Sequence, residues 1–375
     1  MEVSEFDEFI DDWFIESLKT YRDLHVYQLE FPTRVIEWTS GKTICVAGYN
    51  KSTKNQILEL SLPRKLFAEE NKGLCAERDF KVLHGGFSPG PVSVLKHIPG
   101  TRLTVTNDGL TSDLHVWNLG GDDSDVITKV ASFPDSKESS GGVKMAARLR
   151  PQPEVLHGCR GNDIRLTQLT TGQTLYQLAS ACEEHVTSLH FLSDAVFLAA
   201  CANGDVLTVD TRTSAPPQLA PAPPSNDSDV WWADVAGFGL VRVSSSGRAA
   251  VADLRDPGAV VRRAQLAVGT LRGGSDDVNV SWAPALDDII AVSGFGSSVQ
   301  IYDTSSWGAD GRDARPLFEH RGHAVCSPQS SSQAEGGAVA VTHHIWHPKE
   351  RRTLVSAADD TSLHVWDWIS QSQSR

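Results

Sequence analysis

The 375-residue chain has few cysteines and no long apolar run, and each of these lacks excludes a class of protein. Its six cysteines include no C-x-x-C pair, which disfavours both a zinc site and a disulfide framework. No uncharged apolar run approaches the roughly 18 residues that a membrane-spanning helix needs. The acidic start, MEVSEFDEFIDDW, lacks the basic and then apolar pattern of a signal peptide. We therefore expect an intracellular soluble protein.

Basic residues are also in deficit, with 34 Lys and Arg against 47 Asp and Glu, a formal net charge of -13. The few basic pairs, such as Arg262-Arg263, are isolated rather than gathered into a patch. A surface of this kind repels a phosphate backbone, so we expect no direct binding of nucleic acid. The sequence also lacks a phosphate-cradling glycine loop, a zinc-protease motif and an EF-hand loop, and we expect no cofactor.

The clearest structural signal in the sequence lies near the C-terminal end. It consists of HRGH, an insertion, and then THHIWHPKERRTLVSAADDTSLHVWDW. Three short apolar or alternating segments follow one another there, at Ile345–His347, Thr353–Ala357 and Ser362–Trp366. His347-Pro348 and Asp359-Asp360 separate them and favour turns. A Gly-His pair ahead of three strands that end in Trp-Asp is typical of one blade of a WD40 propeller.

The spacing within this blade predicts a structural tetrad. Asp360 lies in the tight turn six residues before Trp366, so the strand can return the indole towards that carboxylate. The Gly-His loop is expected to bring His323 across to bridge the two. Trp donates one hydrogen bond, Asp accepts, and imidazole does both, while Ser356 offers a further hydroxyl. We interpret the group as structural rather than catalytic.

Degenerate versions of the blade recur along the whole chain. Their third strands end near residues 61, 118, 168, 210, 253, 303 and 367, and LHVW recurs verbatim at 114–117 and 363–366. The third version, at residues 155–168, is the most degraded. The gaps match the ~40–45-residue period of the repeat once visible insertions are removed. We predict an all-β, seven-bladed WD40 β-propeller over residues 24–369, with eight blades as the alternative.

The N-terminal segment is predicted to close the ring. Residues 1–23 carry an apolar stripe at helical spacing and predict an amphipathic helix that packs on the body or meets a partner. Residues 24–29, LHVYQL, alternate like a strand. The chain stops soon after Asp367, too early for an outer strand of the last blade, so this segment can supply it. Residues 370–375 form a tail.

The sequence gives less support to a metal site or an enzyme active site than to a scaffold. His343, His344 and His347 form a metal-like cluster, but the outer two lie roughly 13 Å apart on a strand, too far for a compact zinc site. A propeller enzyme with a site at the central channel is the alternative function. The innermost strands, such as VSVLKHI and VTSLHFL, are mostly apolar or Ser. They therefore favour a scaffold without catalytic or metal-binding residues.

Candidate partner contacts are aromatic, because aromatic side chains are enriched at binding hot spots. We select Trp13 and Phe14 on the N-terminal helix and Trp231 and Trp232 at the start of the fifth blade. The charged loop 64–91 is a further candidate. At least one of the two neighbouring indoles must point inward, because successive residues of a strand face opposite ways.

Several longer segments carry a family resemblance that runs nearly end to end. They are WFIESLKTYRDL, ENKGL with ERDFKVLHGGFS, VLHG, VSGFG, and HHIWHP with TSLHVWDW. Together they resemble the WD repeat-containing protein 73 family of propellers. The resemblance implies a non-enzymatic cytosolic scaffold, monomeric on its own. Its implied roles are assembly of the Integrator RNA-endonuclease module beside a helical-repeat partner, and association with microtubules and spindle poles in mitosis, with some nuclear presence.

Overall fold

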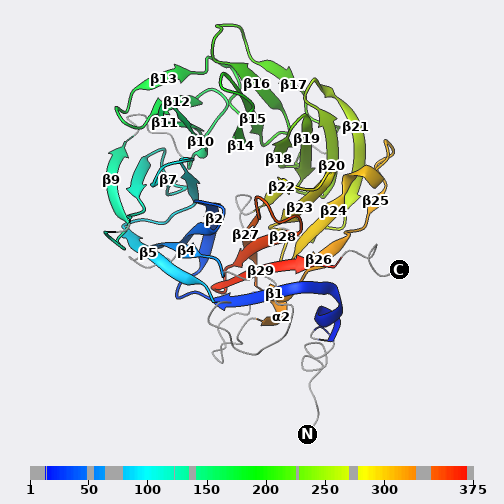
Figure 1. The fold of residues 1–375 in the computed structure, drawn as a ribbon. Helices are drawn as coiled ribbons and strands as arrows, with labels where there is room; N and C mark the ends of the chain where they lie inside the picture. Colours follow the sequence, from blue (N-terminus) through cyan, green and yellow to red (C-terminus); the bar gives the residue numbers. More distant parts are fainter. Residues whose placement is uncertain are drawn as a thin grey trace.

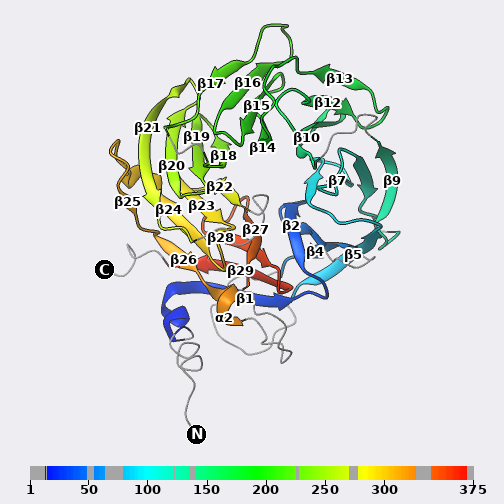
Figure 2. The same cartoon turned by 180° about the vertical axis from the view of Figure 1, so that it is seen from behind.

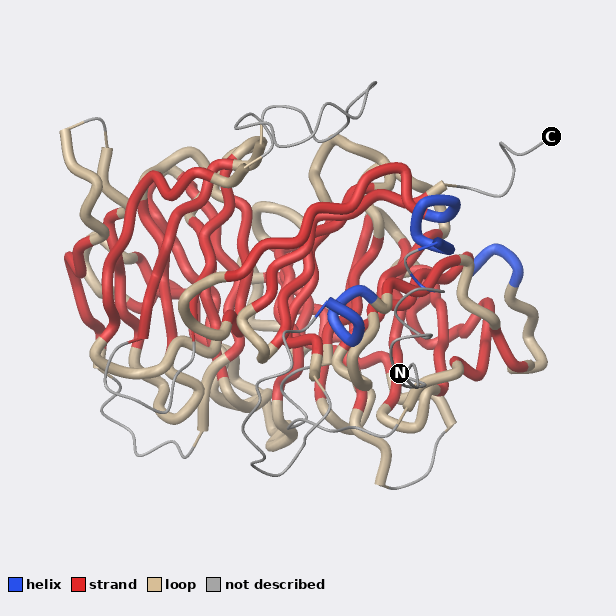
Figure 3. The backbone as a smooth tube through the Cα atoms, turned by 90° about the horizontal axis from the view of Figure 1, so that it is seen from below, coloured by secondary structure: helices blue, strands red, loops and turns tan. Residues whose placement is uncertain are grey.

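The structure is a computed structural model of the full chain. Its described residues are 13, 15–48, 55–63, 79–121, 123–134, 141–224, 228–269, 278–326 and 339–369. They form seven sheets, antiparallel except for one short edge pair, arranged around a central axis (Figures 1 and 2). Seen from the edge, the molecule is a flattened disc whose strands cross its thickness (Figure 3). The predicted seven-bladed propeller is therefore confirmed, and the eight-bladed alternative is excluded.

Blades one to three each use four consecutive strands, from the axis outwards. Blade one contains β2 (Thr33–Trp38), β3 (Thr43–Gly48), β4 (Asn55–Ser61) and β5 (Lys81–Ser88). Blade two contains β6 (Val94–His97), β7 (Leu103–Asn107), β8 (Leu114–Asn118) and β9 (Thr128–Phe133). Blade three contains β10 (Lys144–Arg150), β11 (Gln152–Gly158), β12 (Arg165–Gln168) and β13 (Thr174–Gln177).

Blades four to six follow the same order. Blade four contains β14 (Val186–Phe191), β15 (Val196–Cys201), β16 (Val206–Asp210) and β17 (Gln218–Ala220). Blade five contains β18 (Trp231–Ala236), β19 (Gly239–Ser244), β20 (Arg248–Asp253) and β21 (Asp256–Leu266), plus the short parallel β25 (Asp313–Ala314). Blade six contains β22 (Asn279–Trp282), β23 (Ile289–Ser293), β24 (Val299–Asp303) and β26 (Phe318–His320), with a 3-10 turn η3 (Thr304–Ser306).

Blade seven joins the two ends of the chain. Its inner strands are β27 (Val341–Trp346), β28 (Thr353–Ala358) and β29 (Ser362–Trp368), and its outer strand is β1 (Tyr21–Gln28). The antiparallel ladder sets Leu24 opposite Trp366 and Val26 opposite His364, and Figure 1 shows β1 lying along β29. The predicted closure of the ring is confirmed. The strand begins at Tyr21 rather than at 24, because the preceding helical turns end at residue 20.

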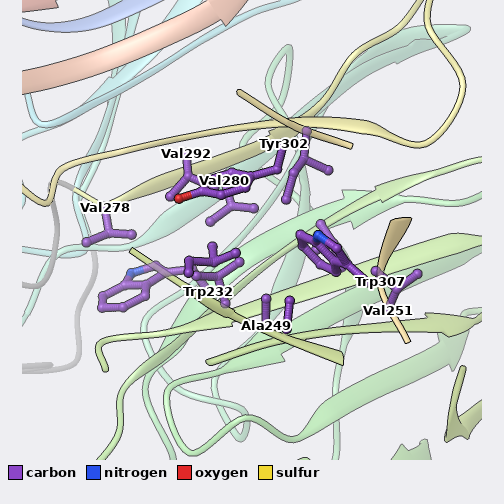
Figure 4. Packing of buried hydrophobic residues seen from close by; sticks show 13 residues of the cluster. Trp232, Ala249, Val251, Val278, Val280, Val292, Tyr302 and Trp307 are labelled. Atoms are coloured by element: carbon purple, nitrogen blue, oxygen red, sulfur yellow. The ribbon is translucent and has the colours of Figure 1, made fainter. Parts of the chain in front are cut away.

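The apolar side chains of each strand pack between neighbouring blades. Seven clusters of buried residues occur among the described residues, one at each interface between adjacent blades. The interface between blades five and six shows the pattern, with Trp232 and Val251 of one sheet packed against Val280, Val292 and Tyr302 of the next (Figure 4). Burial of apolar area between sheets, rather than in one central core, thus holds the ring together.

Candidate functional site

The Gly-His loop forms a short helix, α2 (Gly322–Cys326), which brings His323 onto blade seven. His323 is fully buried, with Nδ1 2.7 Å from the Ser362 hydroxyl and Nε2 2.8 Å from the Ser356 hydroxyl. The Trp366 indole N–H donates to the Ser356 oxygen at 3.1 Å. At the other end the Ser362 hydroxyl donates to Asp360 Oδ1 at 2.5 Å. The result is one continuous relay from Trp366 to Asp360.

The direction of this relay follows from its ends. Because Ser362 donates to a carboxylate, its oxygen accepts from Nδ1–H of His323, and Nε2 of that ring accepts from Ser356. His323 is then neutral, and burial lowers its pKa to about 3. The predicted His323, Asp360 and Trp366 are thus brought together, but through two serines. Ser362, which the sequence reasoning missed, is signalled only by its place directly after the turn.

Two further buried histidines lie beside the relay. His320 places Nδ1 2.8 Å from the Tyr21 hydroxyl and Nε2 3.0 Å from Nδ1 of His364. The ring of His364 stacks on that of His323, with centroids 3.8 Å apart and planes 8° from parallel. The His320 ring lies parallel to the Trp366 indole at 4.5 Å. Burial lowers the pKa of both His320 and His364 well below the ordinary value.

The three histidines resemble a metal-binding set, since their nearest ring nitrogens all lie within 4.8 Å of one another. The ring orientations argue against that use. Lone pairs lie in the plane of each ring, so the stacked rings of His323 and His364 cannot both aim at one ion. Both nitrogens of His323 and of His320 already have hydrogen-bonding partners. The geometry fits a hydrogen-bonded latch between blades rather than a metal centre.

The other histidine cluster separates in space. His344 lies between the hydroxyls of Ser281 and Ser293, each 2.7 Å away on blade six. His347 accepts from the backbone N–H groups of the following turn through Nδ1. His343 lines the central channel. The three side chains therefore serve three different surroundings.

The two neighbouring tryptophans of blade five require a correction. Trp231 is 2% exposed and Trp232 is 5% exposed, so neither indole offers a contact surface to a partner. The inner strand β18 is covered on both sides by neighbouring blades. One indole meets Gly204 of blade four, and the other packs in the interface with blade six (Figure 4). Alternation along the strand therefore buries both residues instead of exposing one.

The N-terminal candidates are only partly described. Trp13 is half-buried and packs edge-to-face on Tyr21, with ring centroids 6.3 Å apart. Phe14 lies outside the described residues, as do residues 64–78 of the charged loop. The helical turns at 15–20 leave Ile15 56% and Leu18 71% exposed. This apolar pair, rather than Trp13 alone, is what the described part of the helix presents to solvent.

The central channel also differs from expectation. Apolar residues of the innermost strands, such as Leu95 and Leu189, turn into the interfaces between blades. Both leucines still contribute to the lining of the channel, which also includes Arg34, Lys96, Lys144, His190 and His343 together with serine, threonine and further apolar residues. The expected apolar and serine residues are therefore present in the lining, but basic and imidazole side chains line the channel beside them.

Two serines have neighbours or sequence contexts that could suggest a catalytic nucleophile. Ser188 lines the channel beside His190, but its hydroxyl donates to the Ala233 carbonyl at 2.9 Å rather than to the imidazole. Residues 86–90 read Gly-Phe-Ser-Pro-Gly, a pattern found at nucleophile elbows. Ser88, however, ends strand β5 and is 3% exposed, with no helix between it and β6. Neither serine has the strand-turn-helix setting or the base that acyl transfer needs.

In the described part of the chain, no helix is long and apolar enough to cross a membrane.

Comparison with known proteins places these features in a family. No protein-family model matches the chain. It is similar to three proteins, each named "Integrator complex assembly factor WDR73". The protein from Danio rerio is 43% identical over 97% of this chain and 98% of its own length. Those from Homo sapiens and Xenopus laevis are 39% and 37% identical, over 96% and 94% of this chain and 97% of their own lengths. The chain therefore belongs to the WDR73 family of propeller proteins.

Proposed function

We propose that this protein is a non-catalytic scaffold that assists assembly of the Integrator complex. The observation that carries the proposal is the 43% identity with a protein named as an Integrator complex assembly factor, which extends over 97% of this chain. Such coverage includes all seven blades rather than one domain. A closed ring of packed sheets supports the proposal physically, because it is a rigid body that presents many loops and outer strands to partners.

The proposal has a finer form. The partners would be the subunits of the RNA-endonuclease module, held together with a helical-repeat protein. The chain would act as a monomer in the cytoplasm, with a smaller nuclear fraction. An association with tubulin and spindle poles in mitosis is a second role, and it rests on the family resemblance alone. A non-catalytic role is supported by the channel serine Ser188, whose hydroxyl is committed to a backbone carbonyl.

Affinity purification of the tagged full-length chain, followed by mass spectrometry, tests the proposal. Integrator subunits recovered in near-stoichiometric amounts from interphase cells would support it. Recovery of tubulin and centrosomal proteins alone would contradict the assembly role and favour the spindle role. A second readout is the amount of assembled endonuclease module after depletion of the chain, which should fall while the total amount of each subunit stays unchanged.

A surface variant sharpens this experiment. Leu18 of the N-terminal helical turns is 71% exposed, so Leu18→Asp should weaken capture of partners without loss of stability. Leu219 on β17 of blade four is 55% exposed, and Leu219→Asp is the matched control. Equal capture by both variants would remove the helix from the partner surface while leaving the scaffold role intact.

A further inference from the structure

Two free cysteines meet at the junction between blades three and four. The sulfur atoms of Cys182 and Cys201 lie 3.8 Å apart, with 19 positions between the two residues along the chain. Cys182 lies in the connection that leads from β13 to β14, and Cys201 ends strand β15. Cys201 belongs to the buried apolar cluster that joins the two blades, and Cys182 packs against the same cluster. The fold therefore places two thiols side by side at one junction of the ring.

The two thiols differ in their access to solvent. Cys182 is partly exposed, whereas Cys201 is 0% exposed. Burial, the neighbouring Cys182 and then the charges of Asp205 and Glu184 raise the pKa of Cys201 far above that of a free cysteine. A protonated and enclosed thiol reacts slowly with small oxidants, because the thiolate is the nucleophile. Oxidation of the pair must therefore begin at Cys182.

The remaining described cysteines are enclosed. Cys45 is 0% exposed and Cys159 is 5% exposed, and the sulfur of Cys159 lies 3.7 Å from Nδ1 of His185. Of the four cysteines in the described part of the chain, Cys182 alone is not buried. Within this part of the molecule an oxidant in solution thus meets Cys182 first, and the thiol of Cys201 lies directly behind it.

The backbone around Cys182 permits the sulfur atoms to approach one another. A disulfide bond is about 2.05 Å long, so one side chain must turn towards the other. Residues 179–183 have no regular secondary structure, whereas Cys201 is paired with Val186 in the ladder between β14 and β15. The adjustment therefore falls on Cys182. A Cβ at position 161 would lie 2.8 Å from the Cys182 sulfur, so the glycine there provides the space that this thiol occupies.

We propose that Cys182 and Cys201 are a reversible oxidation site, at which a hydroperoxide converts the two thiols into one disulfide. The Cys182 thiolate attacks an oxygen of hydrogen peroxide, the O–O bond breaks, and the departing hydroxide takes up a proton to become water. The Cys201 sulfur then attacks the sulfenic acid on Cys182. The S–S bond forms as the S–O bond breaks, and the Cys201 proton leaves with the hydroxide as a second water. A dithiol reverses the change by thiol-disulfide exchange.

The bond ties the connection between blades three and four to strand β15. One junction of the ring is then fastened covalently when peroxide is present and released by reductants. The partly exposed position of Cys182 suits such a reversible bond better than a permanent structural one, because exposed disulfides are the labile ones. This site goes beyond the proposed assembly role and does not depend on which complex the chain serves.

Peroxide treatment of the reduced full-length chain tests the site. The native protein is exposed to hydrogen peroxide, and its remaining thiols are blocked with N-ethylmaleimide. Digestion with trypsin and a glutamate-specific protease then cuts the chain after Glu183 and Glu184, between the two cysteines. Mass spectrometry should show the Cys182 peptide joined to the Cys201 peptide as the main disulfide-linked product. Dithiothreitol added before the blocking step should remove it.

Cysteine variants separate the two chemical steps. Cys182→Ser should abolish the linked product. Cys201→Ser should leave Cys182 as a sulfenic acid, which dimedone traps in higher yield than in the unsubstituted chain. Cys159→Ala is the matched control, since it removes a buried thiol of blade three and should leave the linked product unchanged. Thermal unfolding of each reduced variant shows whether the fold is kept.

The outcomes support or overturn the pair. A link between Cys182 and Cys201 in the native chain, lost in Cys182→Ser and kept in Cys159→Ala, would support the site. A link from Cys182 to a different cysteine would overturn it, as would the absence of any oxidation at Cys182. Formation of the link only in urea would show that the folded ring holds the sulfur atoms apart. Sulfinic acid at Cys182 without a link would leave a single reactive thiol in place of the proposed pair.

Discussion

The hydroxyl of Tyr21 lies 2.8 Å from Nδ1 of His320, although 299 residues separate them in the chain. Tyr21 begins the closing strand β1 of blade seven, whereas His320 ends the outer strand β26 of blade six. His320 then contacts His364 of β29 through its second nitrogen. The closing strand is thus attached to its own blade by a ladder and to the preceding blade by a buried hydrogen bond.

Tyr21→Phe should lower the free energy of unfolding by about 1–3 kcal/mol, because a buried imidazole nitrogen loses its partner. Urea unfolding at pH 7 measures the change. Tyr176→Phe is the matched control, since the Tyr176 hydroxyl on β13 makes no hydrogen bond to a described residue. The control should change stability by less than about 0.5 kcal/mol. Equal values for the two variants would mean that the Tyr21 contact contributes nothing to closure.

Ser356→Ala should cost about 2–4 kcal/mol, because it removes the partner of both the Trp366 N–H and His323 Nε2. Thermal and urea unfolding provide the measurement. Ser132→Ala removes an exposed serine-histidine contact of 3.0 Å to His115, and it should be nearly neutral. If Trp366→Ala or Asp360→Ala left thermal stability unchanged, the relay would not be what holds blade seven together.

The sequence predicted a strand or blade correctly where a local motif marks it. The Gly-His loop, the Asp-Asp turn and the repeated LHVW predicted the seventh blade and the number of blades, and the alternation of residues 24–29 predicted the closing strand. Inner strand β10 of blade three was missed, because its residues, KMAARLR, carry no Trp-Asp or turn signal and the predicted blade began at residue 155. The pairing of Asp313 with Gln265 on blade five could not be predicted from the sequence either. It joins the insertion after the third strand of blade six to the outer edge strand of blade five.

The functional surfaces were harder to predict for a related reason. Alternation tells which residues of a strand share a face, but not what covers that face. Trp231 and Trp232 were assigned to a partner surface, yet inner strand β18 has a neighbouring blade on both sides. Arg34, Lys144 and His343 lie far apart in the sequence, and only the closed ring brings them into the lining of one channel.

Arg102→Leu should be strongly destabilising, because Glu59 is fully buried between blades one and two. The guanidinium contacts both carboxylate oxygens, at 2.9 and 2.5 Å. Burial alone would raise the pKa of Glu59, but hydrogen bonds from Arg102, Thr39 and His84 lower it below its ordinary value. Loss of the arginine leaves the buried carboxylate without its guanidinium partner and with only the contacts to Thr39 and His84, which costs about 3–5 kcal/mol at pH 7.

The control for this variant is another arginine held by two oxygens of a carboxylate. Arg212 pairs with Asp210 on blade four, but its side chain is 72% exposed. Arg212→Leu should therefore cost less than about 1 kcal/mol. Urea unfolding of both variants measures the difference between them. A similar small cost for both would show that the Glu59 carboxylate does not depend on Arg102 for its compensation.

Stability should fall on acidification, because buried histidines stay neutral in the folded ring. Burial lowers the pKa of His323, His343 and His344 to about 3, and that of His320 and His364 well below 6.5. Between pH 6.5 and pH 3 the unfolded chain therefore binds more protons than the folded one, so the free energy of unfolding decreases as pH falls. Each histidine contributes up to about 1.4 kcal/mol per pH unit in that window.

One carboxyl group has the opposite effect on the pH dependence of the free energy of unfolding. Burial raises the pKa of Asp367 to about 6, so the folded state takes up that proton before the unfolded state does. Urea unfolding at pH 7.5, 6.5 and 5.5 should thus show a net loss on acidification. His323→Gln should reduce the slope by up to one proton. An unaltered slope in this variant would mean that His323 takes up a proton in the folded ring as easily as in the unfolded chain, and that the relay does not require its neutral form.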